Sequence, residues 1–179
     1  MTDQSVKVEI LEAAIKLYTS KPPEKVTVEE IAETAGVSKG LIFYYFKNKD
    51  NLEKEVADFF FRKLFLEFKD EIKNVGDLID ITTRNFTELQ HLTRFSAYIS
   101  GKVLYSGDYD FFRDILKEVM DMIVLMFKKE RVLEPEVTAI ALMAMFDGLS
   151  LYSLFYDIGN IEEYRKLALD IVECRRLKK

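Results

Sequence analysis

The sequence has few of the residues from which disulfides, metal sites and hydrolytic active sites are built. Its 179 residues include no tryptophan, one histidine and one cysteine. Cys174 therefore has no partner for a disulfide within the chain. The patterns typical of zinc proteases, serine hydrolases and phosphate-binding loops are missing as well. We expect no enzyme, no metal and no cofactor.

Proline and long hydrophobic runs are also scarce. Three prolines and seven glycines leave long helices uninterrupted. No apolar run approaches the roughly 18 residues of a membrane-spanning helix, and no secretory signal pattern is present. With 49 % hydrophobic and 32 % charged residues, the composition is globular rather than disordered. The sequence predicts a soluble cytoplasmic protein without a membrane partner.

The net charge of −5 argues at first sight against binding to nucleic acid, whose phosphates attract lysine and arginine. Residues 1–50 contain seven lysines, eight acids and no arginine. The segment 36–49, however, contains no acid at all. It combines basic and aromatic side chains, namely Lys39, Lys47, Lys49, Tyr44 and Tyr45. The distribution of charge therefore leaves one local strip suited to DNA.

Helical periodicity and capping signals divide the N-terminal third into three helices. Apolar residues recur at helical spacing over 5–19, and Pro22 and Pro23 end that helix. Thr27 and Glu30 have the spacing of a capping box for a short second helix, which Gly36 ends. Ser38 can then cap a third helix. Only residues 35–37 separate the second helix from the third.

The remainder predicts further helices and no strand. Asn48 caps a long helix with a broad apolar face, and the pattern breaks at 74–77. A helix follows from Leu78, with a short one over 94–99 before Gly101. Helical periodicity resumes after Asp108 and predicts another helix. Further helices run from Pro135 to about residue 156, where Gly159 ends the pattern, and from Asn160, with Glu163 forming a second box-like start.

We therefore predict an all-α fold of about nine helices. A three-helix helix-turn-helix DNA-binding head occupies residues 1–48, and a helical ligand-binding and dimerisation body occupies 49–179. Two short helices joined by a three-residue, glycine-containing turn form this motif, whose second helix can enter the major groove. Spacing alone is a moderate signal, because other helical hairpins share it.

The residues of the motif add a specific resemblance. The stretch from Thr27 to Lys49 reads TVEEIAETAGVSKGLIFYYFKNK and resembles the signature of the TetR family of transcriptional regulators. The resemblance covers about residues 5–55 and implies operator binding by the third helix. Beyond it, the chain is similar to the family only in length and helical character. Phe43 departs from the pattern, because tyrosine is common there.

Seven residues are the candidate DNA contacts. Ser38 caps the third helix, and a helix N-terminus also attracts phosphate. Lys39 can donate to guanine, where phosphate attraction is the alternative. Gly40 allows close approach of DNA or of another helix, and one of the two tyrosines could instead fill the core. The candidates are Thr27, Ser38, Lys39, Gly40, Tyr44, Tyr45 and Lys49.

A homodimer is expected, since one short helix reads only a few base pairs and operators repeat with two-fold symmetry. The last two helices offer small residues for close approach and a large apolar surface. The candidate interface residues are Ala141, Ala144, Gly148, Leu149, Tyr152, Phe155, Tyr164, Leu167, Ala168 and Ile171. Alternatively, this surface packs entirely inside one subunit.

The body contains many of the 14 phenylalanines and nine tyrosines, most of which must fill core. Some could line an apolar ligand cavity. His91 and Arg94 could meet an anionic head group or lie at a solvated helix end, and Asp147 needs a partner such as a cationic ligand. The candidates are Phe60, Leu64, Phe86, His91, Arg94, Phe95, Tyr98, Met122, Met143, Phe146 and Asp147.

These observations together predict a ligand-responsive TetR-type regulator. We expect a repressor that binds a double-stranded, pseudo-palindromic operator as a homodimer and is released by a small hydrophobic effector. The long helix from Asn48 would link the ligand to the DNA-binding head. The alternative is a helical interaction module that keeps the fold without specific operator binding, which the acidic total and the missing arginines mildly favour.

Overall fold

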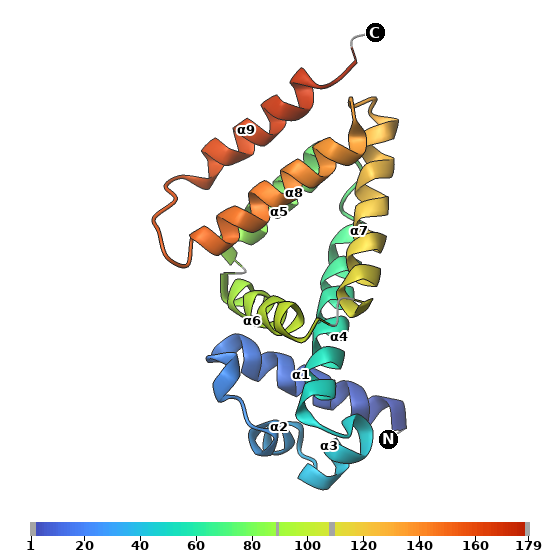
Figure 1. Ribbon diagram of the computed structural model, residues 1–179, viewed down its shortest axis with the longest axis vertical. Helices are drawn as coiled ribbons and strands as arrows, with labels where there is room; N and C mark the ends of the chain where they lie inside the picture. The colour runs from blue at the N-terminus through green and yellow to red at the C-terminus, as the bar shows by residue number, and fades with distance from the viewer. Residues whose placement is uncertain (1–2, 89, 108–109, 178–179) are drawn as a thin grey trace. The chain divides into compact units, whose positions relative to one another are not determined.

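The computed structural model describes residues 3–88, 90–107 and 110–177. Within these ranges it contains nine α-helices, one 3₁₀ helix and no strand (Figure 1), which confirms the all-α prediction. The elements are α1 (Asp3–Ser20), η1 (Pro23–Lys25), α2 (Val28–Ala35), α3 (Lys39–Phe46), α4 (Lys49–Lys69), α5 (Val75–Glu88), α6 (Gln90–Ser106), α7 (Asp110–Lys129), α8 (Pro135–Tyr152) and α9 (Ile161–Cys174).

The predicted signals at the ends of α2 and α3 are present. The Glu30 amide donates to Thr27 Oγ1 at 3.2 Å, and the Thr27 amide donates to Glu30 Oε2 at 2.9 Å, which completes the capping box. Gly36 ends α2 with a φ of 67°, a left-handed conformation that favours glycine. Ser38 caps α3 by accepting from the Leu41 amide at 3.2 Å.

Three sequence-based boundaries were wrong. In place of a short helix over 94–99, α6 extends from Gln90 to Ser106 and passes through Gly101. Burial of its apolar face outweighs the modest helix penalty of one glycine. The helix that begins at Pro135 ends at Tyr152, and Gly159 lies in the following loop. Asn160 caps α9 through the Glu162 amide at 3.1 Å rather than through a box with Glu163.

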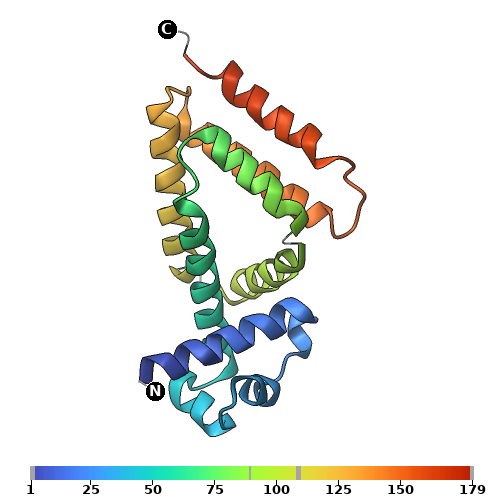
Figure 2. The ribbon, with the colours of Figure 1, turned by 180° about the vertical axis from the view of Figure 1, so that it is seen from behind.

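The chain divides into two compact units. The first combines residues 1–64 with 94–112, so it contains the whole predicted head together with the start of α4 and most of α6. α1 packs against α2, and α2 packs against α3, as both views of the ribbon show (Figures 1 and 2). Fully buried side chains of this unit include Ile10, Tyr18, Val26, Ile31, Ile42, Phe46, Leu52 and Phe95.

The second unit combines residues 65–93 and 113–179. α5, α7, α8 and α9 share one core, whose members include Val75, Ile79, Ile123, Phe127, Ala139, Phe146, Ala168 and Val172. A clip closes this unit after α9. Arg176 pairs with Val132 in an antiparallel bridge, and the Leu133 amide donates to the Arg175 carbonyl at 2.8 Å.

Candidate nucleic-acid interface

α3 has one buried face and one exposed face. Ile42 and Phe46 are each only 1 % exposed and anchor the helix to the first unit's core. Ser38, Lys39 and Gly40, at the start of the helix, are exposed. This arrangement leaves the first turn of α3 available to an anionic ligand.

Tyr44 and Tyr45 differ in exposure, as in the alternative in which one of the two rings packs toward the core. Tyr44 is 75 % exposed, whereas Tyr45 is half-buried. Their rings meet edge to face with centroids 5.3 Å apart, and Tyr45 also approaches Phe46. Phe43 is 37 % exposed on the same short helix. Tyr44 is therefore the tyrosine whose ring is free to contact another molecule.

Lys39 is already engaged in the free chain. Its ammonium forms an ion pair with the Glu29 carboxylate of α2, and it lies 5.7 Å from the centroid of the Phe43 ring. The hydrogen bond from Lys39 lowers the pKa of Glu29 below its usual value. Sequence analysis missed Glu29, although its place in the first turn of α2 puts it near the start of the recognition helix.

Lys49 is less available than the sequence suggested. Its ammonium donates to the Val26 carbonyl at 2.6 Å and lies 3.6 Å from Glu53 Oε1. Glu53 thus compensates a lysine that is unfavourable in the first turn of a helix. Thr27 is exposed beside it and is occupied by the capping box. Lys47 is exposed and has no ion-pair partner among the residues described.

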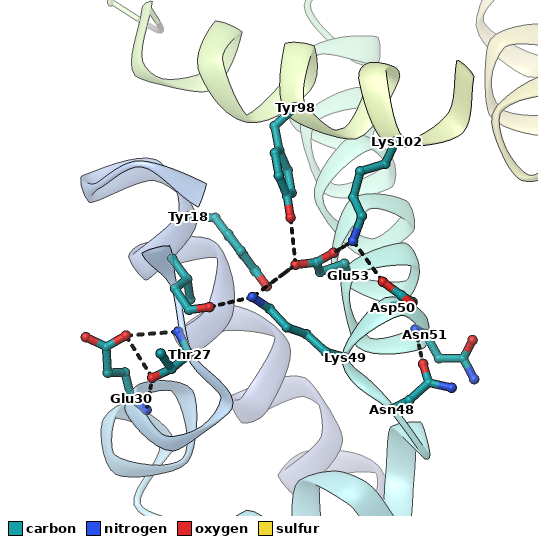
Figure 3. Close-up of polar contacts among 11 residues, drawn as sticks. Tyr18, Thr27, Glu30, Asn48, Lys49, Asp50, Asn51, Glu53, Tyr98 and Lys102 are labelled. Carbon is teal, nitrogen blue, oxygen red and sulfur yellow. Dashed lines mark hydrogen bonds and ion pairs between the residues drawn. The ribbon is translucent and has the colours of Figure 1, made fainter. Parts of the chain in front are cut away.

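A buried acid in the first unit was not among the predicted site residues. Glu53 is 1 % exposed and accepts hydrogen bonds from the hydroxyls of Tyr18 and Tyr98, both at 3.1 Å (Figure 3). Lys102 forms an ion pair with Glu53 and another, at 2.9 Å, with Asp50. The available signal was an acid inside the apolar stripe of the long helix, next to Leu52.

Burial and charge shift the pKa values of this cluster in consistent directions. Burial, and then the Glu53 carboxylate, raise the pKa of Tyr18, and the same causes raise the pKa of Tyr98. Partial burial alone would lower the pKa of Lys102, but its bonds to Asp50 and Glu53 outweigh that effect and raise it. Lys102 in turn lowers the pKa of Asp50. Both shifts favour the charged forms of Lys102 and Asp50.

The candidate ligand residues fall into separate groups. Phe60 and Phe95 meet edge to face at 5.5 Å in the first unit, where Tyr98 bonds to Glu53 and Arg94 is exposed. Phe146 belongs to the second unit's core, against which Met122 and Met143 pack. The side chains of Leu64, Phe86 and His91 lie outside those that the structure describes. A shared ligand cavity stays a prediction.

Asp147 lies apart from these buried candidates. It is exposed on the side of α8 that also exposes Ala144 and Leu151. Desolvation by its surroundings nevertheless raises its pKa. No hydrogen bond or ion pair of its side chain occurs among the described residues. Its position groups Asp147 with the candidate dimer surface.

The candidate dimer residues are partly available. Tyr152 is 66 % exposed, Phe155 79 % and Leu167 47 %, and Ala141 and Ala144 are exposed. The half-buried residues are Gly148, Leu149, Tyr164 and Ile171. Ala168 is a correction, because its side chain is fully buried in the core of its own subunit, where α9 packs on α5. An apolar surface of this extent remains open on α8 and α9.

No helix in the described ranges is both long and apolar enough to cross a bilayer. The same residues contain no group of three histidines, cysteines or acids suited to a metal ion.

Comparison with known proteins agrees with the helix-turn-helix assignment. Residues 10–56 match the family model described as bacterial regulatory proteins, tetR family. The HTH-type transcriptional regulator TtgR of Pseudomonas putida is 24 % identical over 94 % of this chain and 92 % of its own length. YuxN of Bacillus subtilis, an uncharacterised HTH-type regulator, is 34 % identical over 38 % of this chain and 23 % of its own length.

Solved structures share the fold along nearly the whole chain. A TetR transcription regulator from Haloarcula marismortui has a TM-score of 0.80 at 17 % identity, covering 96 % of this chain and 98 % of its own. NalD of Pseudomonas aeruginosa, described as the secondary repressor of a multidrug efflux pump, has a TM-score of 0.59 at 16 % identity over 98 % of both chains. The predicted recognition is thereby confirmed: residues 10–56 form a TetR-family helix-turn-helix domain, and the chain has the fold of TetR transcription regulators.

Proposed function

We propose that this regulator is a repressor that binds a pseudo-palindromic operator as a homodimer and leaves it when a small hydrophobic effector binds. The observation that carries the proposal is the exposed strip of α3. Ser38, Lys39 and Tyr44 are exposed, while Ile42 and Phe46 fix the opposite face in the core. A helix anchored in this way presents its free side chains rigidly to a groove.

The chemistry of this strip suits duplex DNA. A lysine ammonium can donate to guanine N7 or O6, and a tyrosine hydroxyl can donate to phosphate. Gly40 would let the first turn of α3 approach the DNA closely. Packing within the chain does not require this glycine, because a Cβ there would meet only Ser38 Oγ, at 3.9 Å. Thr27 and Tyr45 lie on either side of this turn in the sequence and are weaker candidates for phosphate contacts.

The open apolar surface on α8 and α9 supports the homodimer. Val137, Ile140, Leu151 and Tyr152 are each between 47 % and 66 % exposed along one helix. Contiguous apolar surface on a soluble protein usually marks an interaction site. A two-fold dimer would present two copies of α3 to half-sites about 34–36 Å apart.

The effector and the repressor activity in this proposal rest on other observations. Aromatic side chains of α4 and α6, such as Phe60 and Phe95, offer the apolar contacts that a hydrophobic effector needs. α4 begins three residues after α3 ends and is 21 residues long, so movement of α4 would reach the recognition helix directly. The described role of NalD favours repression over activation.

Selection of genomic DNA bound by the purified protein tests the proposal. We expect enrichment of one pseudo-palindromic sequence, and a loss of operator affinity of about 10- to 100-fold for Lys39→Ala or Tyr44→Ala. Lys16→Ala removes an exposed lysine from α1 and serves as the charge-matched control. If no sequence is enriched, or if the control loses as much affinity as Lys39→Ala, the chain is better described as an interaction module.

A further inference from the structure

Glu53 joins three helices of the first unit, α1, α4 and α6, through its carboxylate (Figure 3). Its side chain is 2 % exposed. Tyr18 reaches it from α1, Tyr98 and Lys102 from α6, and Lys49 from the first turn of α4. A buried carboxylate is stable only when such partners satisfy it. The position of Glu53 is therefore tied to the positions of all these elements.

Lys49 extends the cluster to the DNA-binding motif. Its ammonium donates to the carbonyl of Val26 at 2.6 Å, and Val26 directly precedes Thr27, the N-cap of α2. Lys49 itself lies three residues after Phe46, the last residue of α3. Lys49 thus connects the residues just before α2 to the start of α4, which follows α3.

The charges of the cluster balance only while all its members are present. Glu53 and Asp50 face Lys102, which bonds to both, and Lys49 approaches Glu53 at 3.6 Å. Without Lys102, the ion pair of Glu53 with Lys49 would remain. Attraction would then draw the ammonium toward Glu53 and away from the Val26 carbonyl.

α6 is fixed to this cluster by more than charge. The Lys102 ammonium lies 5.6 Å from the centroid of the Tyr98 ring. One turn before Tyr98, the Phe95 ring stacks on Tyr18 with centroids 5.3 Å apart. Tyr18, Phe95 and Tyr98 therefore keep one face of α6 in register with α1. A shift of α6 would break several of these contacts together.

We propose that Glu53 is a positioning residue for operator binding and that Lys102 of α6 controls it. While Lys102 pairs with Glu53 and Asp50, Lys49 stays on the Val26 carbonyl and keeps the start of α2 beside the start of α4. Withdrawal of Lys102 transfers Lys49 to Glu53, frees the entry of α2 and changes the orientation of α3. This inference rests on the proposed operator binding, for which it names the residues that connect α6 to the reading helix.

The test compares Lys102→Met with Lys63→Met. The control removes another lysine that bridges elements of the same unit, since Lys63 of α4 pairs with Glu12 of α1 at 3.1 Å. We expect Lys102→Met to lower operator affinity about tenfold and Lys63→Met to leave it unchanged. Lys102→Arg should retain affinity, and Lys102→Met combined with Glu53→Gln should regain most of it, because no buried charge is left without a partner.

Hydrogen exchange supplies a readout that general destabilisation would not produce. In Lys102→Met, amides of residues 26–31 should exchange faster, while those of 123–127 in the second unit's core stay unchanged. Tyr98→Phe removes one bond to Glu53 with less risk to folding and should give a smaller loss of affinity, about threefold, with the same local exchange pattern.

Three results would overturn the proposal: wild-type operator affinity in Lys102→Met, equal losses in Lys102→Met and Lys63→Met, or faster exchange throughout the chain. If Lys102→Met does not fold, wild-type affinity and exchange in Tyr98→Phe would overturn it as well. Failure of the proposed function is distinguishable, because it would leave the wild type without a selected operator. The exchange at 26–31 would then still show whether Lys102 controls the entry of α2.

Discussion

Lys39 on the recognition helix is held by Glu29, an acid on the preceding helix of the same motif. The pair is exposed, with half of the Lys39 side chain and 62 % of the Glu29 side chain open to solvent. Such pairs contribute little to stability, because water screens them. The carboxylate nevertheless places a negative charge next to the side chain expected to meet a base.

Glu29→Gln should therefore weaken the discrimination between operator and unrelated DNA rather than the affinity for DNA. Loss of the carboxylate removes repulsion of phosphates, so affinity for unrelated duplex DNA should rise about threefold, and more than affinity for the operator. Fluorescence anisotropy on both duplexes at several salt concentrations measures the ratio. Glu33→Gln, one turn further along α2 and also exposed, is the control. Equal effects of the two variants would contradict a special role for Glu29.

We expect Lys47 to contact phosphate and Lys49 to have a structural role. Lys47 is exposed without an ion-pair partner in the described ranges, so Lys47→Met should reduce the slope of log affinity against log salt by about one. Lys49 serves the Val26 carbonyl and Glu53, so Lys49→Met should lower the melting temperature. Thermal unfolding of both variants, and their operator affinities over a series of salt concentrations, distinguish the two roles. The opposite pattern would restore Lys49 as the phosphate contact.

Glu30 should make stability fall in acid. Hydrogen bonds from Lys21, and then from Thr27, lower the pKa of Glu30 from 4.5 to about 2. A carboxylate with a lowered pKa stabilises the folded state fully above its unfolded value and loses this effect as pH falls toward about 2. Urea unfolding should place Glu30→Gln below the wild type at pH 7, with a difference that shrinks below pH 4.5. A difference independent of pH would contradict this account.

Asp147 should weaken self-association at neutral pH. Desolvation raises its pKa in the folded chain, so its ionised form is unfavourable there, and contact with a second copy would increase that cost. Asp147→Asn should therefore tighten the dimer at pH 7.4, with a smaller difference as pH approaches the usual value of 3.8. Sedimentation velocity measures both. Ala144→Arg, on the same side of α8, should instead give monomers, while Thr34→Arg in α2 should not.

Short-range signals were enough to predict the DNA-binding head. The capping box of Thr27 and Glu30, the left-handed Gly36 and the Ser38 cap all act within four residues, so the sequence displays them directly. The full length of α6 could not be predicted from such short-range signals. Its helical pattern is interrupted by Gly101, and its contacts with Tyr18 and Glu53 join residues 45 to 77 positions apart.

The same reason explains the misplaced site residues. Glu53 was not singled out, because Tyr18 comes from α1 and both Tyr98 and Lys102 come from α6, far from it in the sequence. Lys49 was predicted to bind phosphate because the sequence does not reveal that the Val26 carbonyl lies within its reach. Ala168 was assigned to the dimer surface because periodicity identifies an apolar face of α9 without telling which neighbour covers it.

The clip after α9 has a consequence for association. Main-chain pairing of residues 131–133 with 175–177 holds the last turn of α9, and Arg175 adds a bond to Thr138 at 2.8 Å. Frayed helix ends lose conformational freedom when they dock, and this loss subtracts from affinity. In this chain the conformational freedom of the end of α9 is already lost when the single subunit folds. A second copy would meet a surface that needs no further ordering.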